Sequence, residues 1–140
     1  MTITPDTLEY REDQPAKEDF VNLYATTGWR ALDFLNAEDF EEALKHSWYM
    51  LAAYHEGQLV GFGRVLSDGI YHAFICEMIV RPTHQGQGIG QAILERLIAK
   101  CQAHNILQVQ LFSASGKAGF YKKFGFEERA PDAPGMQLSR

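Results

Sequence analysis

Residues 80–90 join an apolar run to a helical pattern, and this junction constrains the fold more than any other stretch of the chain. Residues 73–80 before it are apolar except for Glu77, as expected of a buried strand. After it, apolar side chains recur on one face of a predicted helix: Ile89, Ile93, Leu94, Leu97, Ile98 and Cys101. Pro82 cannot donate a ladder hydrogen bond and therefore ends the strand. We predict a strand, a glycine-rich turn and a helix in that order.

The turn has the features of an anion site. Gly86, Gly88 and Gly90 lack a Cβ, so backbone N–H groups can converge on a ligand there. The first turn of the following helix adds unpaired N–H groups and a partial positive charge, which suits a phosphate or pyrophosphate. A P-loop is excluded because the run Gly-x-x-x-x-Gly-Lys-Ser/Thr does not occur. A dinucleotide fingerprint is excluded because Gln91 stands where its third glycine belongs, and residues 108–110 offer no carboxylate.

The pattern that remains is Gln85-x-x-Gly88-x-Gly90 after a strand that ends in Val-x-Pro. It resembles the pyrophosphate loop of the GNAT N-acetyltransferase superfamily. Residues 118–126 resemble the second motif of that family, Ala-x-x-Phe-Tyr-x-x-x-Gly-Phe, and the order and spacing of the two blocks also fit. The resemblance is strong from about Trp48 onward and weak before it.

Length and composition indicate one globular domain over residues 1–140. The net charge of −5 argues against nucleic acid or an anionic membrane as the partner and is compatible with a cationic amine. Cys76 and Cys101 lie in apolar patterns and are expected to be buried and reduced. No apolar run reaches the ~18 residues of a membrane-spanning helix, and we expect a cytoplasmic protein. The oligomeric state is left open between a monomer and a homodimer.

Further periodic runs predict a strand at residues 8–12, a helix from Pro15 to Gly28, a helix at 37–45 and a hairpin of 48–55 with 58–66. Gly61 and Gly63 indicate a bulge or a close backbone approach. After the long helix we expect a strand at 107–112, a helix capped by Ser115, and two short strands at Phe126 and 136–138.

The chain is therefore predicted to be α/β, a mixed α+β arrangement with helices on both faces of a sheet. The resemblance implies a central mixed, mostly antiparallel sheet of about six or seven strands, splayed in the middle.

The resemblance implies an acetyl-CoA-dependent N-acetyltransferase that acts on a small primary amine by direct attack on the thioester. Only a neutral amine attacks, and deprotonating an alkylammonium of pKa ~10 at neutral pH costs about 4 kcal/mol, so a general base is needed. Glu77 is the first candidate because a carboxylate within an apolar strand needs a partner or a function. Tyr121 matches the family tyrosine that protonates the leaving thiolate. Two alternatives stay open: a non-catalytic acyl-CoA-binding sensor, and a protein lysine or N-terminal acetyltransferase.

The resemblance also implies which residues bind the CoA part of the co-substrate. The pyrophosphate cradle comprises Gln85, Gly86, Gln87, Gly88, Ile89, Gly90 and Gln91. Backbone groups of Met78, Ile79 and Val80 are assigned to the pantetheine arm. The second motif contributes Ser115, Lys117, Phe120, Tyr121 and Lys123. Where many relatives carry an asparagine that bonds the pantetheine, this chain has Ala114, so a neighbouring serine would have to substitute.

The acceptor amine is expected against the weakly matching first third of the chain and the start of the central strand. The candidate residues are Tyr24, Trp29, Phe34 and His72, the last also a second candidate base. His84 is expected either to touch phosphate or to be solvated, and His55 is expected at the surface. The scattered histidines have no ligand spacing, so no metal site is expected.

Overall fold

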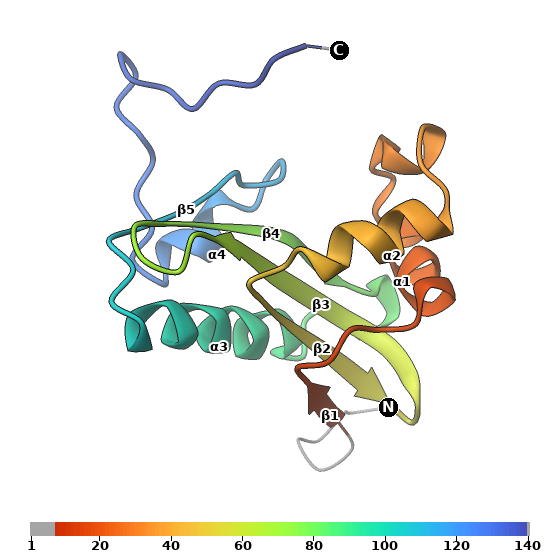
Figure 1. Cartoon of the computed structure of the whole chain (residues 1–140). Helices are drawn as coiled ribbons and strands as arrows, with labels where there is room; N and C mark the ends of the chain where they lie inside the picture. Colours follow the sequence, from red (N-terminus) through yellow and green to blue (C-terminus); the bar gives the residue numbers. More distant parts are fainter. Residues whose placement is uncertain (1–7, 140) are drawn as a thin grey trace. The chain divides into compact units, whose positions relative to one another are not determined.

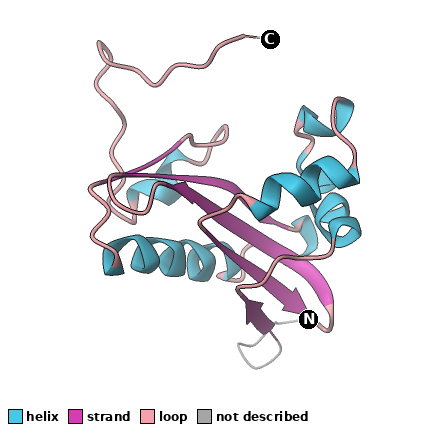
Figure 2. Cartoon of the chain, in the orientation of Figure 1, coloured by secondary structure: helices cyan, strands magenta, loops and turns pink. Residues whose placement is uncertain are grey.

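The computed structural model describes residues 8–139, and these form a five-stranded sheet with helices (Figures 1 and 2). The strands are β1 Leu8–Arg11, β2 Tyr49–His55, β3 Gln58–Ser67, β4 His72–Val80 and β5 Gln108–Leu111. The α-helices are α1 Lys17–Tyr24, α2 Ala37–Lys45, α3 Ile89–Ala103 and α4 Ala118–Lys122. Three 3₁₀ segments are η2 Ala25–Thr27, η3 Arg30–Asp33 and η4 Pro82–His84. None of the described helices is long and apolar enough to cross a membrane.

Most of the predicted elements are confirmed, and α2 has the predicted bounds. It begins at Asn36, whose side chain accepts from the Asp39 N–H while the Asp39 carboxylate accepts from the Asn36 N–H, a reciprocal capping box. The helix predicted from Pro15 to Gly28 is shorter: α1 passes into η2, and Gly28 ends that segment with a φ of 72°. The predicted mixed α/β class with a mostly antiparallel sheet is also confirmed.

The prediction of six or seven strands is wrong, because the described residues form five. No strand begins at Phe126 and none occupies residues 136–138. Pro131 and Pro134 remove two backbone donors from this stretch, and the apolar side chains of Met136 and Leu138 are exposed. Ser115 does not cap α4 either, since the helix begins after Lys117 with no side-chain cap.

The chain divides into two compact units, residues 1–110 and 111–140. The first contains the sheet through most of β5 with α1, α2 and α3, and the second contains α4. The single domain over residues 1–140 stays a prediction. In the first unit the strand order is β1-β2-β3-β4-β5, and the three pairs from β1 to β4 are antiparallel.

Alternation along β3 directs side chains to two different packing layers. Phe62 belongs to the core cluster with Phe20 and Leu23 of α1 and with Leu44 of α2. The intervening glycines face α3: a Cβ on Gly61 would lie 2.9 Å from Ile89 Cγ2, and one on Gly63 would lie 2.9 Å from Ile93 Cγ2. The predicted close approach at these glycines is confirmed. It allows α3 to cover one face of the sheet while α1 and α2 cover the other (Figure 1).

A bulge interrupts β4 opposite Gly63. Phe62 pairs with Ile79 and Arg64 pairs with Cys76, so two residues of β4 oppose one of β3. Those two residues are Glu77 and Met78, and Glu77 has a φ of 50°, which is unusual for a residue with a side chain. The bulge thus places an unusual backbone conformation at the predicted base, three residues before β4 ends at Val80.

Candidate active site

Glu77 is held by an arginine that the sequence analysis did not single out. Arg64 Nε donates to Glu77 Oε2 at 2.6 Å and Arg64 Nη2 to Oε1 at 3.3 Å. Only 11% of the Arg64 side chain and 24% of the Glu77 side chain are exposed. Burial alone lowers the pKa of Arg64, but the hydrogen bond and charge of Glu77 outweigh it, so the pKa rises above its usual value. The guanidinium therefore stays charged and orients the carboxylate.

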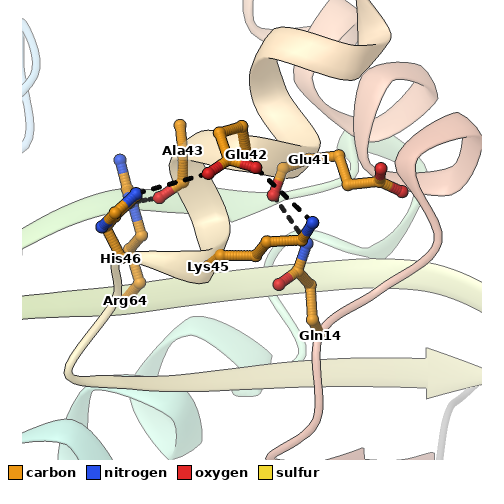
Figure 3. A network of polar contacts seen from close by, with 7 residues as sticks. All are labelled: Gln14, Glu41, Glu42, Ala43, Lys45, His46 and Arg64. Atoms are coloured by element: carbon orange, nitrogen blue, oxygen red, sulfur yellow. Dashed lines mark hydrogen bonds and ion pairs between the residues drawn. The ribbon is translucent and has the colours of Figure 1, made fainter.

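Arg64 also connects the bulge to the end of α2. Its Nη1 donates to the carbonyl oxygen of Ala43 at 3.1 Å and to Ser47 Oγ at 3.3 Å. Figure 3 shows this arginine beneath the last turn of α2, where Gln14 also donates to the carbonyl oxygen of Glu41. The last carbonyl groups of a helix have no partner within it, and a cation there is favourable. One side chain thus links β3, the bulge in β4 and α2.

Tyr24 lies near enough to Glu77 for the two to interact electrostatically. Burial raises the pKa of Tyr24; a backbone hydrogen bond with Ala31 opposes this rise, and the negative charge of Glu77 adds to it. Tyr24 also packs edge-on against Trp29, with ring centroids 5.7 Å apart. The indole is 39% exposed, so it presents apolar surface beside the buried tyrosine. Tyr24 thus packs against Trp29 and interacts electrostatically with Glu77.

The other two predicted acceptor residues lie differently. Phe34 follows η3 directly and is exposed. His72 stacks on Tyr71 at the first position of β4, with ring centroids 4.1 Å apart. It stands five residues from Glu77 along the strand, about 16 Å at ordinary strand rise, so it is not part of the Glu77 cluster.

Cys76 precedes Glu77, and its surroundings keep its thiol protonated. Burial, followed by the negative charge of Glu77, raises the pKa of Cys76 to about 12. A thiol is a weak nucleophile compared with its thiolate. Cys76 is therefore poorly suited to form an acetyl-enzyme at neutral pH.

The glycine-rich turn lies between β4 and α3, in the predicted order of strand, turn and helix. Gly86 and Gly88 have φ values of 77° and 85°, and a Cβ on either would meet no other atom within 4 Å. Gly88 is the N-cap of α3 and has no side-chain cap. The start of α3 thus lacks a side-chain cap, which is compatible with an anion site. Gln85 and Gln91 are exposed, and their amides bond to Val80 O at 3.0 Å and to Glu95 Oε1 at 3.2 Å.

Met78, Ile79 and Val80 continue from the bulge to the end of β4. Ile79 and Val80 pair with Phe62 and Gly61 of β3, and Met78 lies within the bulge against Gly63. Their assignment to the pantetheine arm stays a prediction. The splay between β4 and β5 also stays a prediction. The two strands are neighbours in the sheet, and just before β4 the carbonyl oxygen of Tyr71 accepts from Gln108 N at 2.9 Å.

Tyr121 lies in α4 of the second unit. Burial raises its pKa above the usual tyrosine value, so the hydroxyl is protonated at neutral pH, as a general acid must be. Its ring packs edge-on against Phe120 at 5.1 Å and Phe126 at 6.1 Å. Of the other predicted cofactor residues in this unit, Ser115, Lys117 and Lys123 are exposed.

The structure corrects one expectation about the histidines and narrows another. His55 is not a surface residue, since its side chain is 12% exposed. Of the two alternatives for His84, the solvated one is wrong, since the residue is 9% exposed, and contact with phosphate stays a prediction. The two rings are hydrogen-bonded to each other through Nδ1 of His55 and Nε2 of His84 at 3.0 Å. The sequence offers little to predict this contact, because 29 positions separate the pair. For Arg64 the sequence did carry a signal: like Glu77, it is a charged residue within a mostly apolar strand and could have been singled out for that reason.

The match to a family model decides the family. The acetyltransferase (GNAT) domain matches residues 46–128, which is more than half of the chain. The chain belongs to the GNAT acetyltransferase family. Members of this family are acyltransferases, and the expectation drawn from the two motifs is confirmed.

Relatives of this GNAT chain agree with the assignment. Serotonin N-acetyltransferase 2 of rice is 33% identical over 107 residues, which cover 74% of this chain and 54% of that protein. Histone acetyltransferase TAP1 of soybean is 36% identical over 106 residues, which cover 67% and 46%. A crystal structure of a probable acetyltransferase from Staphylococcus aureus has a TM-score of 0.83 at 26% identity, covering 95% of this chain and 99% of that one. The chain spans about half the length of these two curated relatives.

Proposed function

We propose that this GNAT chain transfers the acetyl group of acetyl-CoA to the primary amine of a small molecule that carries an aromatic or other apolar group. The observation that carries the proposal is the cluster of Glu77, Tyr24 and Trp29. It combines a carboxylate, which attracts an ammonium group, with exposed aromatic surface, which favours an apolar body.

The residues at the start of α3 fit the diphosphate of acetyl-CoA. Gly86 and Gly88 place no side chain over the helix end, and the Gly88 N-cap leaves the first N–H groups of α3 available as donors. When bound, this co-substrate supplies an activated acyl thioester. The chain's own part is to hold the diphosphate, to position the amine and to move protons.

On the amine side, Glu77 is assigned as the base, directly or through a water molecule. It takes one proton from the ammonium, and the neutral nitrogen then forms the new bond to the acyl carbon while the carbon–sulfur bond breaks. The two hydrogen bonds from Arg64 fix the carboxylate but do not use all of its acceptor positions. A fixed carboxylate meets the geometric requirement of a base better than a mobile one.

On the leaving-group side, Tyr121 is assigned as the acid that gives its proton to the thiolate. Its raised pKa keeps that proton available at neutral pH. The raised pKa of Cys76, about 12, supports direct attack by the amine over an acetyl-cysteine intermediate. The new amide nitrogen then loses its second proton to solvent, Glu77 also releases its proton to solvent, and Tyr121 regains one from solvent. The net products are the N-acetylated amine, free CoA and one proton.

A protein acceptor is the second candidate, because the soybean relative carries the name of a histone acetyltransferase. A lysine side chain presents the same ammonium group to Glu77. Lysine brings no aromatic ring to Trp29, whereas the rice relative carries the name of a serotonin N-acetyltransferase, and serotonin is an arylalkylamine. We therefore place the small arylalkylamine first.

The test is release of free thiol from acetyl-CoA with a panel of acceptors: an arylalkylamine, a polyamine, an amino sugar and a lysine-containing peptide. We expect the arylalkylamine to have the highest kcat/KM, and Trp29→Ala to raise the KM for it. Ile70→Ala is the control, since Ile70 is an exposed apolar residue in the turn that precedes β4. No thiol release above background with any acceptor would refute the function, and a preference for the peptide would replace the substrate class.

A further inference from the structure

His55 and His84 form a buried pair at the point where the glycine-rich turn begins. His55 is the last residue of β2, and His84 is the last residue of η4, directly before Gln85. His55 Nδ1 lies 3.0 Å from His84 Nε2, and Thr83 Oγ1 lies 2.7 Å from the other nitrogen of His84, Nδ1. The pair therefore joins the segment that leads into the turn to the end of β2.

Hydrogen bonding restricts how many protons this pair can hold. A single N–H fits between two ring nitrogens 3.0 Å apart, so one of the two must offer a lone pair. Two neutral arrangements make both hydrogen bonds. In one, His55 Nδ1–H donates to His84 Nε2 and His84 Nδ1–H donates to Thr83 Oγ1. In the other, which is favoured because Glu56 Oε1 lies 3.8 Å from His55 Nε2, His84 Nε2–H donates to His55 Nδ1 and the Thr83 hydroxyl donates to His84 Nδ1. His55 then carries its proton on Nε2, a buried atom without a hydrogen-bond partner.

The charged groups around the pair also favour a neutral His84. Glu56, in the turn after β2, has Oε1 3.8 Å from His55 Nε2 and so faces that nitrogen with a negative charge. Arg81 precedes η4 and is fixed by hydrogen bonds from Nε and Nη2 to the carbonyl oxygen of Leu59. Burial, then His55 and then Arg81 lower the pKa of His84. When both rings are protonated, two N–H groups face each other and the hydrogen bond is lost.

We propose that His84 is a positioning residue for the diphosphate loop, residues 85–90, and that its bond to His55 holds this loop in its binding geometry only while His84 is neutral. The inference rests on the proposed function, because it takes residues 85–90 as the site for the diphosphate. Its consequence is a loss of CoA affinity on acidification that originates in the protein. Since unfolded histidine titrates near 6.5 and the folded pKa of His84 is lower, the loss sets in below that value.

The test is the Kd of CoA, measured by calorimetry from about pH 7.5 to about pH 5 for the whole chain and for His84→Gln. Glutamine retains a donor toward His55 and does not titrate. We expect the wild-type affinity to fall about tenfold or more over this range, since a doubly protonated pair must lose a proton before the loop can dock. Between the upper and the lower pH, His84→Gln should lose much less affinity than wild type does.

Two controls separate the pair from other titrations. The phosphate groups of CoA titrate identically with every variant, so only the difference between the wild-type and variant profiles counts. His46→Gln removes an exposed histidine and should leave the wild-type profile unchanged. His55→Gln serves as a second variant if His84→Gln unfolds, and it too should flatten the profile.

A kinetic readout distinguishes positioning from general stability. Acidification should raise the KM for acetyl-CoA more in wild type than in His84→Gln, with a smaller difference in kcat at saturation. Amide hydrogen exchange of residues 85–90 without ligand, corrected for intrinsic pH dependence, should accelerate at low pH in wild type alone. Identical profiles for wild type and His84→Gln would overturn the inference and leave the proposed function intact. If amide hydrogen exchange showed that residues 85–90 are released at low pH, but CoA bound at no pH, the positioning role would be supported and the proposed function refuted.

Discussion

Arg64 and Glu77 form a bidentate ion pair across the bulge in β4, with Nε and Oε2 2.6 Å apart. Glu77 lies within the bulge with a φ of 50°, and Arg64 stands on β3 next to Gly63. The same guanidinium bonds the Ala43 carbonyl at the end of α2. A residue proposed to act as a base is thus also part of the structure that holds the helices against the sheet.

The first prediction separates these two roles. Arg64→Met should reduce the free energy of unfolding by about 3 kcal/mol, because it leaves a half-buried carboxylate and a helix end without their partner. Glu77→Gln should cost less stability, about 1–2 kcal/mol, since its amide oxygen still accepts from Arg64. It should nevertheless lower kcat by about 10²-fold or more, because an amide cannot take up a proton from the amine.

Denaturant unfolding and thiol-release kinetics measure the two effects. The matched control is Arg11→Met, which breaks the exposed pair of Arg11 and Glu9 and should change stability by less than about 1 kcal/mol. If Glu77→Gln kept the wild-type kcat, Glu77 would be a structural residue only, and a water molecule would be left as the proton acceptor.

The second prediction concerns the contact between β3 and α3. Gly63→Ala should destabilise the protein by about 1–3 kcal/mol, because its Cβ would lie 2.6 Å from Met78 Sδ and 2.9 Å from Ile93 Cγ2. Gly119→Ala is the control: it meets no atom within 4 Å and lies inside α4, where alanine should stabilise by about 0.5–1 kcal/mol. Thermal unfolding of both variants checks the sign of each change, and an unchanged or raised Tm for Gly63→Ala would contradict the packing argument.

Local patterns in the sequence predicted the elements that these arguments use. The apolar face of α3 and the close approach at the glycines facing it could be predicted, because side-chain periodicity and the lack of a Cβ depend only on a few neighbouring residues. Asn36 and Asp39 define the start of α2 by the same kind of local rule. The strands expected at Phe126 and 136–138 were wrong because two short apolar patterns gave no information on whether a neighbouring strand would pair with them.

The site was less predictable than the fold. Glu77 stood out as a charge in an apolar strand, but its partner Arg64 depends on the register of β3 against β4, and a bulge changes that register by one residue. His55 and His84 meet only after β2 and η4 have been placed, so the sequence indicated a surface position for His55 and left His84 between phosphate contact and solvent. Contacts of this kind depend on tertiary structure, and neither periodicity nor spacing encodes them.

The third prediction tests the diphosphate loop with a control matched for backbone strain. Gly88→Glu should abolish measurable acetyl-CoA binding, because it adds a negative side chain at the N-terminus of α3. Gly57→Glu has the same chemistry at a similar φ, 81° against 85°, and neither position has an atom within 4 Å of the added Cβ. Both variants should lose about 1–2 kcal/mol of stability from the strained backbone.

Calorimetric titration with acetyl-CoA distinguishes the two variants of the third prediction. Gly57→Glu should bind with nearly the wild-type Kd, since residue 57 lies in the turn between β2 and β3. Equal loss of binding in both variants would mean that strain or unfolding, and not charge at the helix end, explains the effect. Unchanged binding by folded Gly88→Glu would remove residues 85–90 from the cofactor site.

The fourth prediction concerns Tyr121 and its hydroxyl proton. Tyr121→Phe should lower kcat by about 10²-fold while changing the Kd of acetyl-CoA less than about threefold, because the ring keeps its packing against Phe120 and Phe126 and only the acid is lost. Since burial raises the pKa of Tyr121, the proton is present through neutral pH and is lost only above the ordinary tyrosine value near ~10. The wild-type rate should therefore show no loss assignable to this residue between about pH 7 and pH 9.

Tyr71→Phe, at an exposed tyrosine before β4, is the control for the fourth prediction and should match wild type. A Tyr121→Phe enzyme with the wild-type kcat would show that solvent protonates the thiolate, which is feasible because a thiol pKa near ~8.5 makes it a moderate leaving group.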